Sequence, residues 1–387
     1  MKGRKLLMIP GPIEFDPAVM RAMGAPTTSH IAPSFIEEFG QALERMRQVF
    51  LSSSGQPFVV AGSGTLAMDL AGANLTEPGD AALVINTGYF GDRMVALLER
   101  YGAQVDHVRA EVGDAPALEQ VEAALKARPY QLVTVTHVDT STGVLADVKG
   151  VAALAHAAGA LVVVDGVCSV GGEELRMDEW GIDLVLTASQ KALATPPGLA
   201  LVMAGPRAIA KWRARKTPVS SYYADWNNWL PIMEAYEGRK AAYFGTPAVN
   251  LVSALNVSLG QILTEGMDAR FARHRLLSKA CKAGVEALGL KQLPAAGKRA
   301  NTMTAPYYPE GVDANVLSKI NAAGAILAGG LHPACRTKYF RIGHMGPHTA
   351  NDILATLGAV EKGLSEAGYR FQAGASLAAA QRVFVEG

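Results

Sequence analysis

Two ionisable residues stand at the ends of apolar runs in the sequence. Asp165 follows three consecutive valines, and Lys191 follows the next apolar run, in the segment TASQKA. An unpaired charge is costly to bury, so each side chain needs a partner. Taken singly, Asp165 is equally well explained as a helix cap and Lys191 as a surface residue whose stem covers apolar atoms. On adjacent strands of a parallel sheet, however, the two side chains open into one crevice.

A carboxylate and an amine in this arrangement fit the chemistry of pyridoxal 5'-phosphate. The amine of Lys191 can form a Schiff base with the aldehyde of this cofactor. Asp165 can keep the pyridine nitrogen protonated, which lets the ring accept electrons from a substrate carbanion. The pair is stronger evidence for this chemistry than either residue alone.

The segment AGSGTLAMDL offers a place for the phosphate. It joins an apolar strand to a helix through a glycine-rich turn, so backbone N–H groups at the helix N-terminus can bind an anion. The predicted phosphate ligands are Ser63, Gly64 and Thr65, and Gln190 beside Lys191 is a further donor.

The same loop supports a competing interpretation. Gly62-x-Gly64-x-x-Ala67 imitates the fingerprint of an NAD-dependent dehydrogenase, in which an acidic residue about 20 positions further on binds the ribose. Asp80 meets that spacing only approximately. A dehydrogenase also leaves Lys191 without a role.

Other polar and aromatic residues lie near predicted strand ends. Phe90 can stack on the pyridine ring, although a core aromatic is the more common role for such a residue. Thr140 or Ser141, in HVDTSTGV, can donate to the ring hydroxyl, although an ordinary turn would use the same residues. Arg341 lies on a short apolar strand and is either a clamp for a substrate carboxylate or the partner of a protein acid.

The elements that position these residues alternate between strands and helices. Apolar runs at 57–62, 81–88, 131–137, 160–166, 183–189 and 199–205 are separated by helical patterns. This alternation predicts an α/β fold with a mainly parallel sheet and helices on both faces. After about residue 250, long helices and short strands predict a smaller α+β domain. The aromatic segment 211–247 is predicted to be a long functional or subunit-contact loop.

Several motifs together resemble the class V, fold-type I pyridoxal-phosphate aminotransferases. They are Ser189-Gln190-Lys191, Asp165-x-Val167, Gly62-Ser63-Gly64-Thr65, Thr140-Ser141-Thr142-Gly143 and Arg341-Ile342-Gly343. The segments IPGPI, DEWGIDLVLTASQKA and YFRIGHMG resemble, more narrowly, the alanine–glyoxylate aminotransferases, especially those of fungi. The resemblance covers nearly the whole chain apart from its tail.

The resemblance implies a seven-stranded sheet and a homodimer with shared active sites. Tyr243 and Thr246 would reach the cofactor phosphate of the other subunit, Val167 would contact the cofactor, and Gly11 would close over the substrate carboxylate. The implied domains are an N-terminal arm (1–20), a large cofactor-binding domain (21–250), a small domain (251–371) and an Ala-rich tail (372–387). The sequence departs from the family at Phe90, where animal members have tryptophan, and at Gly166, where serine or alanine is common.

The implied reaction is transfer of the amino group from L-alanine to glyoxylate, giving pyruvate and glycine by a ping-pong mechanism. Serine–glyoxylate and serine–pyruvate aminotransferases are the alternatives within the family. With one clamp arginine assigned, the residues themselves predict only a small amino acid.

The composition and net charge of the chain limit the kinds of binding partner that we expect. The formal charge of +1 gives no electrostatic footprint for nucleic acid or anionic lipid, and no apolar stretch predicts a membrane span. Cys168, Cys281 and Cys335 form no CxxC pair, and no metal site is predicted. A cytoplasmic location is expected, with mitochondria and peroxisomes as alternatives.

Overall fold

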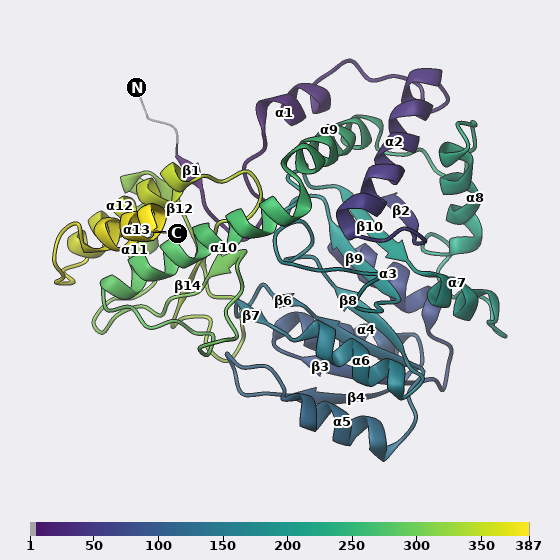
Figure 1. Cartoon of the computed structure of the whole chain (residues 1–387), viewed down its shortest axis with the longest axis horizontal. Coiled ribbons are helices and arrows are strands. Elements are labelled where there is room, and N and C mark those ends of the chain that lie inside the picture. Colours follow the sequence, from purple (N-terminus) through teal and green to yellow (C-terminus); the bar gives the residue numbers. More distant parts are fainter. Residues whose placement is uncertain (1–4, 387) are drawn as a thin grey trace.

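The central element of the protein is a seven-stranded sheet (Figure 1). The computed structural model describes residues 5–386. The strand order is β2-β10-β9-β8-β5-β3-β4, and every neighbouring pair is parallel except those that include β10. The strands are β2 (Gln56–Ala61), β3 (Ala81–Asn86), β4 (Gln104–Arg109), β5 (Leu132–Thr136), β8 (Leu161–Asp165), β9 (Leu184–Ala188) and β10 (Leu199–Ala204).

Burial explains why the sequence predicts six of these seven strands. All residues of β3, β5, β8, β9 and β10 are buried, which requires the continuous apolar runs that predicted them. The seventh strand, β4, lies at the sheet edge, and its sequence QVDHVR has no buried residue. The mainly parallel sheet is confirmed, with β10 as its antiparallel member.

Helices cover the sheet between the strands. α3 (Gly64–Leu75) packs on β9 and β10, α4 (Tyr89–Arg100) on β3 and β4, and α6 (Val148–Ala157) on β5 and β8. The remaining helices of this part are α1 (Pro17–Met23), α2 (Pro33–Phe50), α5 (Leu118–Ala127), α7 (Pro206–Arg213) and α8 (Trp226–Glu237).

The segment 211–247 differs from the predicted loop. α8 occupies residues 226–237, and Trp226 is fully buried with its ring stacked on Phe58, at a centroid distance of 4.9 Å. The aromatic residues Trp226, Trp229 and Tyr236 of α8 therefore pack in the core, whereas Tyr222, Tyr223 and Tyr243 of the same segment are exposed. Pro231 inside the helix and aromatic side chains along it hide the helical period in the sequence.

A second core forms around α10 (Met267–Ala287), which follows α9 (Val249–Glu265) and runs toward a cluster of α11, α12 and α13 (Figure 1). A three-stranded sheet of order β11-β14-β13 belongs to this part. The elements are β11 (Met303–Thr304), α11 (Val316–Ala323), β12 (Ala325–Ile326), β13 (Ala328–Gly329), β14 (Phe340–Gly343), α12 (Ala350–Glu366) and α13 (Ala375–Glu386).

Both ends of the described chain join this second core. β1 (Leu6–Leu7) pairs in parallel with β12, and α13 packs on α10 and α12. The Ala-rich tail is thus mostly helix, and small side chains such as Ala380 let it approach closely. Among the described residues, no helix combines the length and the apolar character needed to cross a bilayer. The predicted domain boundaries stay predictions, and residues 1–4 and 387 lie outside the described part.

Candidate active site

Lys191 lies in the loop that follows β9, and its side chain is 7% exposed. Its Nζ donates a hydrogen bond to the main-chain carbonyl of Pro10. Burial lowers the pKa of the Lys191 ammonium group, and the nearby Arg341 acts in the same direction. A lysine whose pKa is lowered in this way is partly available as a nucleophile and base.

Asp165 ends β8, the parallel neighbour of β9, and its side chain is 3% exposed. One carboxylate oxygen accepts a hydrogen bond from the backbone N–H of Val167 at 3.0 Å. Burial raises the pKa of this carboxyl to about 6; Asp139 acts in the same direction, whereas Lys191 opposes it. Desolvation is therefore the dominant influence, and a cationic group placed against Asp165 would reverse it.

The N-terminus of α3 forms a third part of the crevice. Ser63 is its N-cap residue, and no side chain caps this helix. A β-carbon on Gly64 would lie 3.1 Å from Cγ2 of Val167, so glycine keeps the approach to this turn open. The side-chain oxygen of Gln190 is buried and has no hydrogen-bond partner among the described residues. The backbone N–H groups of this turn can bind an anion, whereas the Gln190 oxygen is an acceptor and its amide group would have to donate through its NH2.

The turn after β5 holds Ser141 and Phe90 through a buried aspartate. Asp139 accepts hydrogen bonds from the backbone N–H of Phe90 at 3.1 Å and from both the N–H and the hydroxyl of Ser141. The Ser141 hydroxyl also accepts a hydrogen bond from the N–H of Tyr89. Its hydrogen bonds are thus made within the protein, and its proton is donated to Asp139. Of the two predicted ring-hydroxyl donors, Thr140 is thus the better candidate.

Asp139 is a site residue that the sequence motifs did not reveal. Its position two residues before Ser141 is typical of an Asx turn, and that spacing was the available signal. Tyr339 was also missed. Its hydroxyl accepts from the N–H groups of Leu331 and His332 and donates to the carbonyl of Ser141, which ties two distant loops together.

Arg341 lies on β14 and faces the same crevice. Its Nε donates to the carbonyl of Gly329 at 2.8 Å, and Nη1 donates to the carbonyl of Thr140 at 3.0 Å. No carboxylate pairs with it among residues 5–386, so the explanation by a protein acid is wrong within that range. The two carbonyls fix the guanidinium plane and leave other N–H groups available for a carboxylate.

Gly11 borders the crevice from the N-terminal segment. Its φ is +90°, and a β-carbon there would lie 2.8 Å from Cε of Lys191. Tyr243 and Thr246, in contrast, are exposed on the surface, and Tyr243 is 65% exposed. Neither bonds to the other predicted site residues within this chain.

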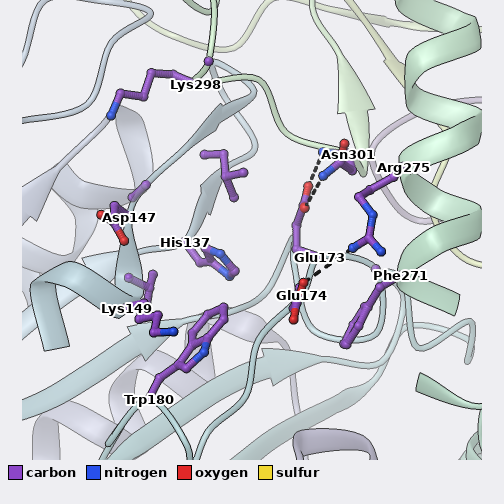
Figure 2. Close-up of a pocket in the computed structure, with 15 residues that line it drawn as sticks. His137, Asp147, Lys149, Glu173, Glu174, Trp180, Phe271, Arg275, Lys298 and Asn301 are labelled. Carbon is purple, nitrogen blue, oxygen red and sulfur yellow. Dashed lines mark hydrogen bonds and ion pairs between the residues drawn. The ribbon is translucent and has the colours of Figure 1, made fainter. Parts of the chain in front are cut away.

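A cavity of about 340 Å³ lies apart from these residues. Figure 2 shows His137, Glu173 and Trp180 around it, with Glu173 bonded to Asn301. Its wall includes none of Lys191, Asp165 and Arg341. Acidic and basic side chains both line this cavity, so its charge favours neither anionic nor cationic ligands.

The dehydrogenase interpretation is contradicted by the position of Asp80. This residue immediately precedes β3, whereas ligands of parallel sheets bind at the carboxyl ends of the strands. Its carboxylate forms an ion pair with Lys211 at 3.1 Å. No ribose-binding acid is therefore present at the required place.

Comparisons with known proteins agree with this geometry. The family model described as "Aminotransferase class-V" matches residues 18–351. The chain is 40% identical to alanine–glyoxylate aminotransferase 1 of Saccharomyces cerevisiae, over 91% of this chain and 95% of the relative. It is 33% identical to serine–glyoxylate aminotransferase of Arabidopsis thaliana, over 98% of this chain and 94% of the relative.

A solved structure matches the whole length of this chain. The ureidoglycine–glyoxylate aminotransferase of Bacillus subtilis superposes with a TM-score of 0.93 at 29% identity, covering 100% of this chain and 99% of that chain. The predicted fold-type I architecture is confirmed by this likeness and by the sheet described above. Family model, sequence relatives and crevice chemistry lead to one conclusion: the chain belongs to the class V aminotransferases.

Proposed function

We propose that this aminotransferase uses pyridoxal 5'-phosphate to move the amino group of L-alanine to glyoxylate. The observation that carries the proposal is the convergence of a buried amine, a buried carboxylate and a guanidinium without an acidic partner among the described residues, in Lys191, Asp165 and Arg341. Each group has a chemically distinct task in transamination.

The residues of the crevice fit this cofactor. The buried carboxyl of Asp165 accepts a hydrogen bond from Val167 and has further lone pairs, so it can also accept one from a protonated pyridine nitrogen. The uncapped N-terminus of α3, with Ser63, Gly64 and Thr65, can hold the phosphate, and Gln190 can add a donor through its side-chain NH2 group. Phe90 and Val167 border the place for the ring, and Thr140 can reach its hydroxyl. When bound, the cofactor supplies the carbonyl that takes up the amino group and the ring that accepts electrons from the α-carbon.

The protein residues bind the substrate and move its proton. Arg341 holds the substrate carboxylate, which fixes the α-carbon in relation to Lys191. Lys191 removes the α-proton as a general base, because burial lowers the pKa of its ammonium group. Asp165 keeps a negative charge at the end of β8, where it stabilises a protonated ring nitrogen. Gly11 and Pro10 cover Lys191 and limit the access of water to it.

The choice of substrates rests on the relatives and on the number of basic groups. The three relatives named above share glyoxylate in their names and differ in the amino donor, which supports glyoxylate as the acceptor. Alanine is the proposed donor because the alanine–glyoxylate enzyme has the higher sequence identity of the two curated relatives. Serine is the alternative donor. Initial rates measured at several fixed glyoxylate concentrations test the proposal, since a ping-pong reaction gives parallel double-reciprocal lines, whereas intersecting lines would contradict it.

The active enzyme is proposed to be a homodimer in the cytoplasm. Tyr222, Tyr223 and Tyr243 are exposed aromatic residues, and Phe244 beside them packs on Trp229. Exposed aromatic groups of this kind mark interaction surfaces. Tyr243 and Thr246 would reach the phosphate in the other subunit. The three cysteines are buried and unpaired, which supports a reducing compartment.

A further inference from the structure

Arg93 is a half-buried arginine of α4 that the proposed function leaves without a task. Its Nη1 donates to the hydroxyl of Thr65 at 3.0 Å, and its Nη2 lies 3.5 Å from the hydroxyl of Tyr89. Its Cζ lies 4.9 Å from the ring centroid of Phe90. The guanidinium thus touches one predicted phosphate ligand and the predicted ring-stacking residue.

The charge of Arg93 has no acidic partner within the described residues. The neighbouring acid Asp92 forms its ion pair with Arg109 instead. A guanidinium has five N–H donors, and a single hydroxyl at normal distance satisfies one of them. A partly desolvated cation in this state is favourable only if an anion or an aromatic face compensates it. The rings of Phe90 and Tyr89 supply the aromatic faces against which the guanidinium lies, and the anion is still to be named.

The position of Arg93 indicates where such an anion would lie. Thr65 is the second residue of α3, so the guanidinium lies beside the uncapped, positively polarised end of that helix. Arg93 also acts to lower the pKa of the Asp165 carboxyl, in addition to its contacts with Thr65 and Phe90. Arg341 faces this crevice from β14, where it is bonded to Thr140.

We propose that Arg93 binds the phosphate of the cofactor together with Ser63, Gly64 and Thr65, and thereby holds Phe90 over the cofactor ring. This inference rests on the proposed cofactor chemistry. The same guanidinium could instead receive the distal carboxylate of a dicarboxylic amino donor. Both ligands are anions, and an experiment separates them.

The test compares the binding of pyridoxal 5'-phosphate and pyridoxal to the cofactor-free protein, followed by visible absorbance. The two compounds differ only in the phosphate group. Arg93→Gln is expected to weaken binding of the phosphorylated compound at least about tenfold and to weaken pyridoxal binding much less, because only the contact with Phe90 is then lost. Arg93→Lys should retain part of the affinity, since it keeps the charge and loses the planar geometry. Arg100→Gln, an exposed substitution on the same helix, is the matched control and should bind like the wild type.

Three results would overturn the inference. Unchanged affinity of Arg93→Gln for pyridoxal 5'-phosphate would show that the guanidinium does not bind the phosphate. An equal loss for both compounds would show that it acts only through the ring pocket. A rise in KM confined to aspartate as donor, with cofactor binding intact, would assign Arg93 to the substrate. If the wild-type protein bound neither compound, the proposed function itself would fail.

Discussion

Gly11 packs directly against the aliphatic stem of Lys191. A β-carbon on Gly11 would lie 2.8 Å from Cε and 3.0 Å from Nζ of that lysine, and the preceding residue, Pro10, accepts its hydrogen bond. The N-terminal segment thus borders the proposed catalytic crevice, although the two residues are far apart in the sequence. Only glycine combines the required φ of +90° with the absence of a side chain.

Gly11→Ala should lower both turnover and stability. The added methyl group must displace Lys191 from its position, and we expect kcat to fall roughly 10- to 100-fold. The backbone strain should lower the free energy of unfolding by about 1–3 kcal/mol. Steady-state kinetics and chemical denaturation measure the two effects.

Gly159→Ala is the matched control for Gly11. Gly159 has a φ of +79°, and no atom would lie within 4 Å of a β-carbon added at this position. This variant should suffer the same kind of backbone strain and keep its kcat. If Gly11→Ala and Gly159→Ala had equal kcat values, contact with Lys191 would not explain the loss.

Arg341→Ala should weaken binding of the amino acid and leave binding of the cofactor intact. The substitution removes a charge-assisted clamp, so KM for alanine should rise roughly 10- to 100-fold. Arg341→Lys should recover only part of the loss, because a lysine cannot form the bidentate contact. Kinetics together with the visible spectrum check this prediction. A protein that lost its cofactor absorbance instead would place Arg341 at the cofactor.

Asp165→Asn should change how stability depends on pH. In the cofactor-free protein, burial raises the pKa of Asp165 from 3.8 to about 6, so the folded state holds a proton that the unfolded state releases. Stability therefore falls as pH rises through this window, and the cost persists above it. At pH 8 the variant should be more stable than the wild type by about 1–3 kcal/mol, and the difference should shrink toward pH 4.

Urea denaturation of both cofactor-free proteins across this pH range measures the effect. Equal pH dependence in the two proteins would show that Asp165 is not desolvated as described. The variant should nevertheless lose at least about 100-fold in kcat with cofactor added, because a neutral amide cannot hold the ring nitrogen protonated. A variant both stable and active would remove Asp165 from the mechanism.

Mixed dimers can test whether Tyr243 acts across a subunit interface. Lys191→Ala and Tyr243→Ala should each be weakly active or inactive alone. In a hybrid dimer, the intact Lys191 of one subunit would meet the intact Tyr243 of the other, so unfolding and refolding the mixture should restore roughly a quarter of wild-type activity. Sedimentation should show a dimer in every sample. A mixture no more active than its components would mean that Tyr243 serves its own subunit.

Much of the fold could be predicted because it depends on local and repetitive features. Buried parallel strands need long apolar runs, and those runs identified six strands and the crevice at their ends. β4 was not predicted, because an edge strand can be polar. α8 was not predicted, because its aromatic residues and Pro231 obscure the helical period. The packing of α13 on α10 depends on Ala residues whose role is defined only by their neighbours.

The site was predictable where one residue type has few alternatives. Lys191, Asp165 and Arg341 are charged groups in apolar surroundings, and each required an explanation. Arg93 was not among the predicted site residues, because its contact with Thr65 depends on how α3 and α4 pack together. Such a contact is absent from any sequence motif.

The most direct measurement is the visible absorbance of the purified protein with pyridoxal 5'-phosphate, before and after L-alanine and again after glyoxylate. We predict an absorption band that disappears with alanine and returns with glyoxylate, and Lys191→Ala should not show this cycle. A band that responds to serine and not to alanine would correct the donor. A wild-type protein that forms no such band with added cofactor would contradict the central claim, that Lys191 binds the cofactor and carries the amino-group transfer.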